Sequence, residues 1–293
     1  MFQSLINNVP WPEKVGTRSA IGPCPGASTA LAIAELASQT GLLVVVTPTT
    51  AAALTLEREL PLFFEKPLEI LTLPDWETLP YDNFSPHQDI VSERLNALHR
   101  LPSMTSGVLI VPVTTLMHRT APTHYIAGNS LVLECGESLD TKTFVRNLVL
   151  NGYRSVDTVY EHGEYAVRGS LLDIFPMGSP LPYRIDLFDN EVETLRTFDP
   201  ESQRTIAKVD SIRLLPAREF PLHEDAIHRF QLNWYRSFDV DAASCPTFNE
   251  ISNGRVPGGE MCARGSSEGR RGRGFFNTTH HVYSTHGNQR ALQ

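Results

Sequence analysis

The first part of the chain alternates short apolar runs with longer segments of helical periodicity. Residues 42–47, 68–73 and 107–113 read LLVVVT, LEILTL and GVLIVPV, and their length and β-branched content predict strands. Apolar positions three and four residues apart predict helices over residues 28–40, 51–64 and 90–101, with a further helix beginning at 114–117. This alternation predicts an α/β fold, a parallel sheet with covering helices, in which the run at 42–47 is fully buried.

The pattern changes near Gly128. Residues 131–134 predict a strand, and residues 140–151 predict a helix that Asp140 caps. Runs of six to eight residues then follow, separated by turns such as Asp189-Asn190, which suits a hairpin. We therefore expect an inserted antiparallel α+β module that ends near Leu215-Pro216.

Two further segments complete the chain. Residues 219–238 predict one amphipathic helix. Residues 261–274, MCARGSSEGRRGRG, hold four Arg and four Gly, and no regular period follows them. We expect disorder from Gly254 onward. An Arg/Gly segment can bind nucleic acid, although four arginines make a weak patch.

Composition limits the classes of function. The formal net charge of −8 argues against non-specific binding to nucleic acid or anionic lipid, although a local patch can still be basic. The four cysteines are far apart and indicate neither a zinc site nor a disulfide framework. No run approaches the roughly 20 apolar residues of a membrane span, and the N-terminus lacks the features of a signal peptide. We expect a soluble cytoplasmic protein with no membrane partner.

Residues 21–29, IGPCPGAST, precede the first predicted helix as a phosphate-binding loop would. A Walker loop needs Gly, four residues, then Gly-Lys-Ser/Thr. The corresponding positions of this chain are Gly22, Ala27, Ser28 and Thr29. The lysine that holds the outer phosphates is missing, and two prolines remove backbone N–H donors. We predict a degenerate, inactive phosphate loop; by spacing alone, an ordinary turn before a helix is the simpler explanation and stays open.

Acidic and histidine side chains gather in residues 74–89, PDWETLPYDNFSPHQD. A carboxylate pair or a metal site can be imagined from Asp75, Glu77, His87 and Asp89. A polar loop explains them as well, and their spacing matches no metal template. His162, between Glu161 and Glu164, is a similarly weak signal. The sequence therefore predicts no catalytic residue and no metal site.

Three stretches carry a specific resemblance. LPDWETLPYDNFSPHQDIVSERLNALHRL (residues 73–101), GVLIVPVTTLM (107–117) and the block that opens HGEYAVRGSLLDIFPMG at His162 resemble the N-terminal region of bacterial transcription-repair coupling factors. The last block also resembles, more loosely, the excision-repair helicase UvrB. The resemblance covers about residues 18–259. UvrB keeps a working Gly-Lys-Thr in its phosphate loop, whereas the coupling factors have lost it. GPCPGAST, which also lacks it, therefore resembles the coupling factors more than UvrB. UvrB's aromatic-rich hairpin has no counterpart after Tyr81.

The resemblance implies a division into domains. It gives a degenerate helicase-like domain 1a at residues 1–127, a UvrA-binding domain 2 at 128–216, a partial domain 1b at 217–259 and a disordered tail at 260–293. Full-length members are ATP-driven DNA translocases that also bind RNA polymerase. The parts that use ATP and Mg²⁺, and that contact polymerase and double-stranded DNA, are implied to be absent here. We therefore expect this chain to be no enzyme and to hold no cofactor.

The resemblance also implies which residues bind UvrA. The family's UvrA-contacting positions match Arg168 in EYAVRG, Arg184 in PYR and Phe188 four residues later. Alternation along PYRIDLFD independently places Arg184 and Phe188 on one face and the aliphatic residues on the other. The aliphatic face must point inward, so an exposed Phe188 beside Arg184 is expected, which is typical of a docking anchor. An edge aromatic covered by another domain is the alternative. Alternation does not place Arg168 on this face, because Gly169 could bulge its strand.

The resemblance stops abruptly after RVPGG at residues 255–259, and we expect a truncated or frameshifted reading frame. The leading prediction is a docking module that recruits UvrA to RNA polymerase stalled at DNA damage, in transcription-coupled nucleotide excision repair. One alternative is a UvrB-type ATP-dependent helicase, which needs a lysine where Ser28 stands. The other is a nucleic-acid binder that acts through the Arg/Gly tail.

Overall fold

A computed structural model describes residues 14–64, 67–78, 85–238 and 241–255. Internal contacts divide the chain into two units, Met1–Asp75 with Ala97–Met117, and Trp76–Asn96 with His118–Gln293. This division does not follow the boundary at 127/128 that the resemblance implies. The first turns of helix α3 (Gln88–Arg100) belong with the second unit, because they make hydrogen bonds and an ion pair there. The assignment of the units to helicase-like domains stays a prediction.

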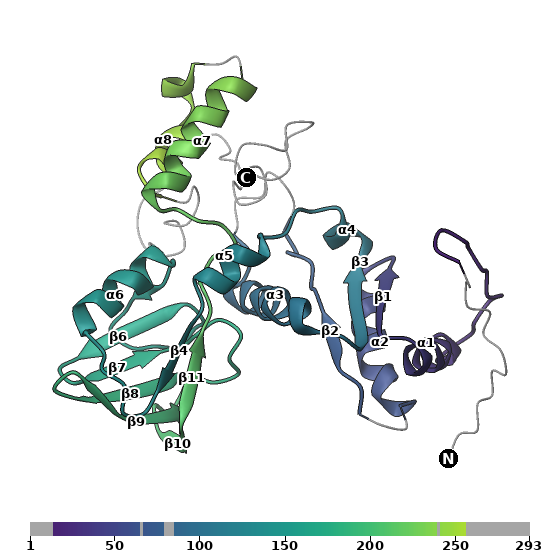
Figure 1. The fold of residues 1–293 in the computed structure, drawn as a ribbon, viewed down its shortest axis with the longest axis horizontal. Coiled ribbons are helices and arrows are strands. Elements are labelled where there is room, and N and C mark those ends of the chain that lie inside the picture. Colours follow the sequence, from purple (N-terminus) through teal and green to yellow (C-terminus); the bar gives the residue numbers. More distant parts are fainter. Residues whose placement is uncertain (1–13, 65–66, 79–84, 239–240, 256–293) are drawn as a thin grey trace, which may run out of the picture. The chain divides into compact units, whose positions relative to one another are not determined.

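The first unit contains a parallel sheet of three strands in the order β1-β3-β2, with helices α1 and α2 packed on it (Figure 1). Its regular elements are α1 (Ser28–Gln39), β1 (Leu42–Thr47), α2 (Thr50–Glu59), a 3-10 helix (Leu60–Leu62), β2 (Ile70–Thr72), a second 3-10 helix (Leu101–Ser103), β3 (Gly107–Pro112) and α4 (Val113–Leu116). The predicted alternation of strands and helices is therefore confirmed. Pro61 accounts for the early end of α2, because proline cannot continue the α-helical hydrogen bonding.

The core of the first unit lies between the sheet and α1 and α2. Its buried members are Ala30, Ala34, Ala37, Ala53, Leu56, Leu60, Val108 and Ile110. The central strand β3 is buried along its whole length, but Val44 and Val46 of β1 are 50% and 47% exposed. The prediction that LLVVVT is fully buried is wrong. β1 is an edge strand with one neighbour, and only the side of Leu43 and Val45 packs against the helices.

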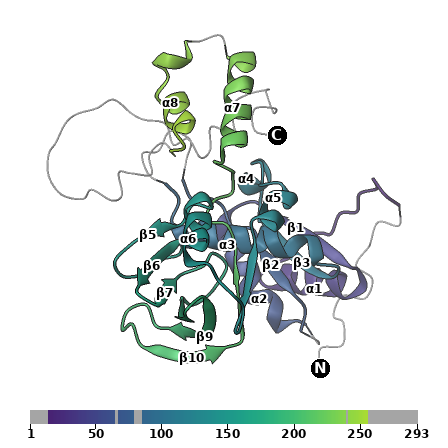
Figure 2. The same ribbon diagram turned by 60° about the vertical axis from the view of Figure 1, so that its left-hand side comes forward.

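The second unit is built on a six-stranded sheet in the order β10-β9-β8-β7-β6-β5, in which only the β5–β6 pair is parallel. Helix α6 lies beside β5 and β6 (Figure 2), and β4 pairs with β11 in a separate two-stranded sheet (Figure 1). The elements are α5 (Thr123–Gly128), β4 (Leu131–Glu134), α6 (Thr141–Leu150), β5 (Arg154–Ser155), β6 (Glu164–Arg168), β7 (Leu171–Ile174), β8 (Tyr183–Phe188), β9 (Glu191–Phe198), β10 (Thr205–Val209) and β11 (Ser211–Leu214). The predicted antiparallel α+β module is present.

Local signals in the second unit act as the sequence predicts. The carboxylate of Asp140 accepts a hydrogen bond from the backbone N–H of Thr143 at 3.2 Å, and so caps α6. Asp189 has a φ of 54° in the two-residue turn between β8 and β9, a conformation that Asp tolerates better than most residues. The cap marks the start of α6, and the turn fixes the connection between β8 and β9.

Two helices follow the sheet. The predicted helix at 219–238 starts only at Glu224, as α7 (Glu224–Ser237), because the preceding segment contains Pro221 and ends in the cap residue His223. It packs with α8 (Pro246–Ser252) around a small core of Phe230, Ala242, Phe248 and Ile251. The tail that the sequence predicts to be disordered lies outside the described residues, apart from Gly254 and Arg255.

Candidate docking face on the antiparallel sheet

Strand β8 separates an apolar face from a polar one. Ile185 and Leu187 are buried, with 0% and 6% of their surface exposed, whereas Phe188 is 69% exposed. The register of β8 with β9 shifts between Asp186 and Leu187, yet the alternation along β8 continues through that point. The prediction that Phe188 points away from the core is confirmed. We call the side of the six-stranded sheet that carries Arg184, Asp186 and Phe188 the outer face.

Arg168 lies on this outer face as well. In the register of the sheet, Arg168 pairs with Leu171 of β7, which in turn pairs with Asp186 of β8. Directly paired residues project to the same side of a sheet, so Arg168 and Asp186 share a face. Gly169, with a φ of 63°, lies in the turn after the strand and does not bulge it. The Nη2 atom of Arg168 donates to the carbonyl oxygen of Asp157 at 2.6 Å.

Arg184 is held more tightly than the sequence suggests. Its Nε and Nη2 atoms donate to the two carboxylate oxygens of Asp173 at 2.7 and 2.9 Å, and its guanidinium lies 4.8 Å from the ring centre of Phe198. The side chains of Arg184 and Asp173 are only 17% and 3% exposed. The hydrogen bonds that Arg184 donates to Asp173 raise the pKa of Arg184. Arg184 therefore belongs to a neutralised, fixed pair.

Sequence reasoning missed Asp173. The signal was present, because an Asp in the apolar run LLDIF must find a cation or suffer a large desolvation penalty. What the sequence lacks is the pairing partner, since Asp173 and Arg184 become cross-strand neighbours only through the β7–β8 register.

The segment predicted to be a degenerate phosphate loop is held by hydrogen bonds between its own residues. The hydroxyl of Ser28 donates to the carbonyl oxygen of Pro25 at 2.6 Å, and that of Thr29 lies 3.4 Å from the carbonyl oxygen of Cys24. The helix α1 follows the loop as expected, but residues 14–27, which are all described, contain no strand before it. A Walker loop connects a strand to a helix. Gly22 and Ala27 thus belong to an exposed turn that has only half of the required context.

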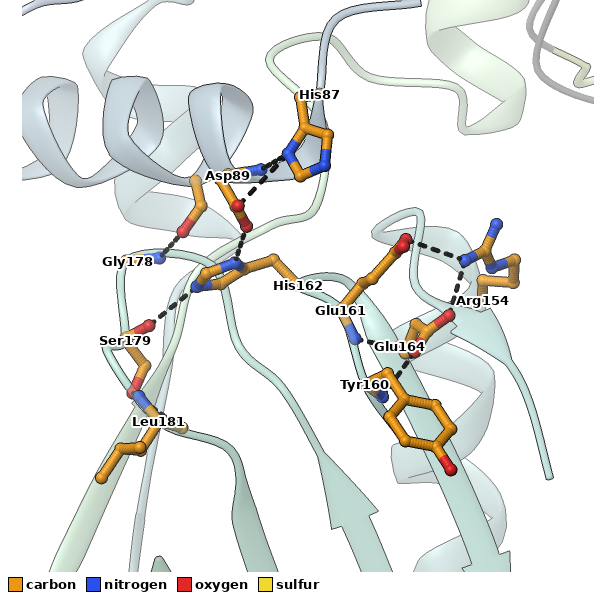
Figure 3. Close-up of polar contacts among 11 residues, drawn as sticks. His87, Asp89, Arg154, Tyr160, Glu161, His162, Glu164, Gly178, Ser179 and Leu181 are labelled. Atoms are coloured by element: carbon orange, nitrogen blue, oxygen red, sulfur yellow. Dashed lines mark hydrogen bonds and ion pairs between the residues drawn. The ribbon is translucent and has the colours of Figure 1, made fainter. Parts of the chain in front are cut away.

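Two weak signals of the sequence meet in the second unit: His87 and Asp89, from the segment where α3 starts, and His162 (Figure 3). Nδ1 of His162 lies 2.7 Å from Oδ1 of Asp89, and its Nε2 lies 2.8 Å from the carbonyl oxygen of Ser179. Nδ1 of His87 lies 3.2 Å from the other carboxylate oxygen of Asp89. Both ring nitrogens of His162 are thus engaged by oxygen atoms, and this network connects the start of α3 to the loops around residues 162 and 179.

Glu164 organises the neighbouring loop. Its Oε2 atom accepts hydrogen bonds from the backbone N–H groups of Tyr160 and Glu161 at 2.8 and 2.9 Å, and its Oε1 atom accepts from Arg154 at 2.5 Å (Figure 3). Glu164 is buried, so these bonds replace the water that the carboxylate loses on folding. The contacts of Glu164 are therefore explained by its role in stabilising this loop.

A buried ion pair connects α3 to the segment after β11. Nε of Arg94 donates to Oε1 of Glu219 at 2.8 Å, and the guanidinium stacks 4.0 Å from the ring centre of Trp76. Arg94 is fully buried. Burial raises the pKa of Glu219, while Arg94 opposes that rise. Such a pair is a structural feature of the second unit.

Metal sites and membrane spans are both absent from the residues that the structure describes. No group of three or more His, Cys, Asp or Glu side chains within the described part of the chain is arranged to hold a metal ion. Among the helices formed by described residues, none has the length and apolar character needed to cross a membrane.

The outer face lies within a segment that matches a known protein family. Residues 131–220 match the family model of the UvrB interaction domain. The chain is 47% identical to the transcription-repair-coupling factor of Escherichia coli K12 over 249 residues, which are 85% of this chain and 22% of that protein. The Haemophilus influenzae factor is 44% identical over 80% of this chain and 20% of its own length. The chain thus spans about a fifth of the length of these relatives. It is similar to the N-terminal region of the transcription-repair-coupling factors, and its residues 131–220 match the UvrB interaction domain.

Proposed function

We propose that the second unit is a docking module for UvrA and that Phe188 on the outer face is its anchor. The observation that carries the proposal is the 69% exposure of Phe188 at the end of β8, inside the UvrB interaction domain. A large exposed aromatic ring at the end of a strand contributes strongly to the binding free energy when a partner buries it. Arg184 and Arg168, which is level with Asp186, share the same face and add polar groups to it.

In this proposal, docking serves transcription-coupled repair. The relatives are named transcription-repair-coupling factors, and a UvrA-binding surface within a longer protein of that kind would bring the damage-recognition machinery to a stalled RNA polymerase. The proposed role of this chain is recruitment, with no catalytic residue and no bound nucleotide. Polymerase binding and ATP-driven DNA translocation would belong to the remainder of such a protein. No observation favours the helicase or the nucleic-acid alternative.

The test is the affinity for purified UvrA, measured by calorimetry or surface plasmon resonance. Phe188→Ala is expected to weaken binding by about 1–3 kcal/mol, or roughly 5- to 150-fold, as the loss of a hot-spot residue does. Leu62→Ala is the matched control, because Leu62 is 72% exposed but lies in the first unit. Equal affinity of the Phe188 variant and the wild-type chain would remove the anchor from the interface.

Arg184→Ala needs a stability control. The substitution removes the partner of Asp173 and leaves a buried carboxylate without its cation, which destabilises a fold by itself. Its melting temperature must therefore be measured beside its affinity. Arg168→Ala carries less of this problem, because Arg168 is exposed and donates to neutral acceptors only.

A further inference from the structure

Around β8, the charges on the outer face fall into two groups, apart from Glu191, which pairs directly with Phe188 and projects to the same side. In the first group, Asp173 pairs with Arg184, and Asp186 pairs with Arg196 at 3.0 Å. Each pair joins one carboxylate to one guanidinium, so its net charge is zero and its field decays quickly with distance. These four side chains fix the middle of the face but offer little long-range attraction to a partner.

The second group consists of Arg168 and Lys208. Lys208 pairs directly with Arg196 in the β10–β9 register, and Arg196 pairs with Arg184 in the β9–β8 register, so Lys208 also projects to the outer face. It is exposed and forms no ion pair with any residue that the structure describes. Arg168 likewise has no carboxylate partner among the described residues, since it donates to a carbonyl and a hydroxyl oxygen.

These two cations lie on opposite sides of the strand that carries the anchor. The strand order β10-β9-β8-β7-β6 puts Lys208 on one side of β8 and Arg168 on the other. With strands about 4.8 Å apart, β6 and β10 are separated by roughly 19 Å. β8 lies midway between them in the strand order, and Phe188 stands at its end, two residues beyond the level of Arg168 and four beyond that of Lys208. An apolar centre with charged margins is the usual organisation of a protein-binding patch.

We propose that Lys208, together with Arg168, supplies the long-range charge by which this face recognises its partner, and that the partner presents an apolar socket flanked on two sides by carboxylates. This inference rests on the proposed UvrA docking and adds to it one binding residue, Lys208, and a partner chemistry. The paired guanidinium groups of Arg184 and Arg196 make short-range hydrogen bonds and packing contacts. The unpaired cations govern the association rate and its dependence on salt.

The experiment measures association and dissociation rates of the full chain with purified UvrA between about 0.01 and 0.15 M salt, where the Debye length falls from about 30 to about 8 Å. Lys208→Gln is expected to slow association about 3- to 10-fold at the lowest salt, to flatten its salt dependence and to leave dissociation nearly unchanged. Arg213→Gln is the control, because it removes one exposed cation from β11, which is in a different sheet.

A second variant tests the role of the paired charges. Asp186→Asn combined with Arg196→Gln removes a whole ion pair without changing the net charge, and should leave the salt dependence of association as in the wild-type chain. A salt dependence flattened as much as in Lys208→Gln would overturn the division between paired and unpaired cations. Equal association rates for Lys208→Gln and Arg213→Gln would remove Lys208 from the interface. A wild-type chain that does not bind UvrA at all would overturn the proposed function and this inference together.

Discussion

The two sheets of the molecule differ in how they use their exposed surface. The parallel sheet of the first unit ends in β1, whose Val44 and Val46 are about half exposed without any charged neighbour on the strand. The antiparallel sheet of the second unit buries one apolar face and displays charges in fixed pairs on the other, where Phe188 is exposed at the end of β8. The segment that resembles a phosphate-binding loop, residues 21–29, lies in the first unit. The surface with ordered ion pairs, the outer face, lies in the second unit. Spacing that matches a motif is therefore weaker evidence of function than organised side chains.

The largest expected difference concerns ion pairs. Arg94→Ala should lower the free energy of unfolding by about 3–5 kcal/mol, because it leaves Glu219 buried without its main cation. The matched control is Arg100→Ala in the first unit, where the pair with Glu69 is 46% and 39% exposed and the expected change stays below about 1 kcal/mol. Urea unfolding followed by circular dichroism measures both. Losses of similar size would contradict the contrast between the two units.

The second difference concerns apolar residues on strands. Val192 of β9 is fully buried and Val44 of β1 is 50% exposed, so the same substitution can be compared at both sites. Val192→Ala should lower the free energy of unfolding by about 2–3 kcal/mol, through lost burial and a residual cavity, and Val44→Ala by less than about 1 kcal/mol. If Val44→Ala cost as much as Val192→Ala, β1 would have to be covered in solution.

How far the sequence predicts this molecule depends on the range of the contacts involved. Alternation along PYRIDLFD is a local signal, and it placed Phe188 correctly. The cap of α6 and the turn at Asp189 are local as well, and both were predictable. Periodicity gave the wrong burial for β1, because a run of apolar residues does not say whether its strand is central or at an edge.

Contacts between distant parts of the chain could not be predicted from the sequence. Arg94 and Glu219 are 125 positions apart, and Asp89 and His162 are 73 apart, so no local pattern joins them. The partner of Arg184 depended on the register of β7 with β8, which the sequence does not specify. For the candidate site, the exposed face was therefore predictable, and the distribution of charge on it was not.

The smallest expected effect tests the first unit's motif. Ala27→Gly combined with Ser28→Lys restores the Walker residues, and we expect it to give no stabilisation by ATP and Mg²⁺ in a thermal melt. Pro23 and Pro25 would still supply no backbone N–H donors to the loop, and residues 14–27 would still contain no strand before the helix. The wild-type chain with the same nucleotide is the control. An ATP concentration of 100 times the dissociation constant would add about 2.7 kcal/mol, so genuine binding could not be overlooked. A clear ATP-dependent rise in melting temperature of the restored chain alone would mean that the missing lysine, and not the shape of the loop, separates this unit from a nucleotide-binding one.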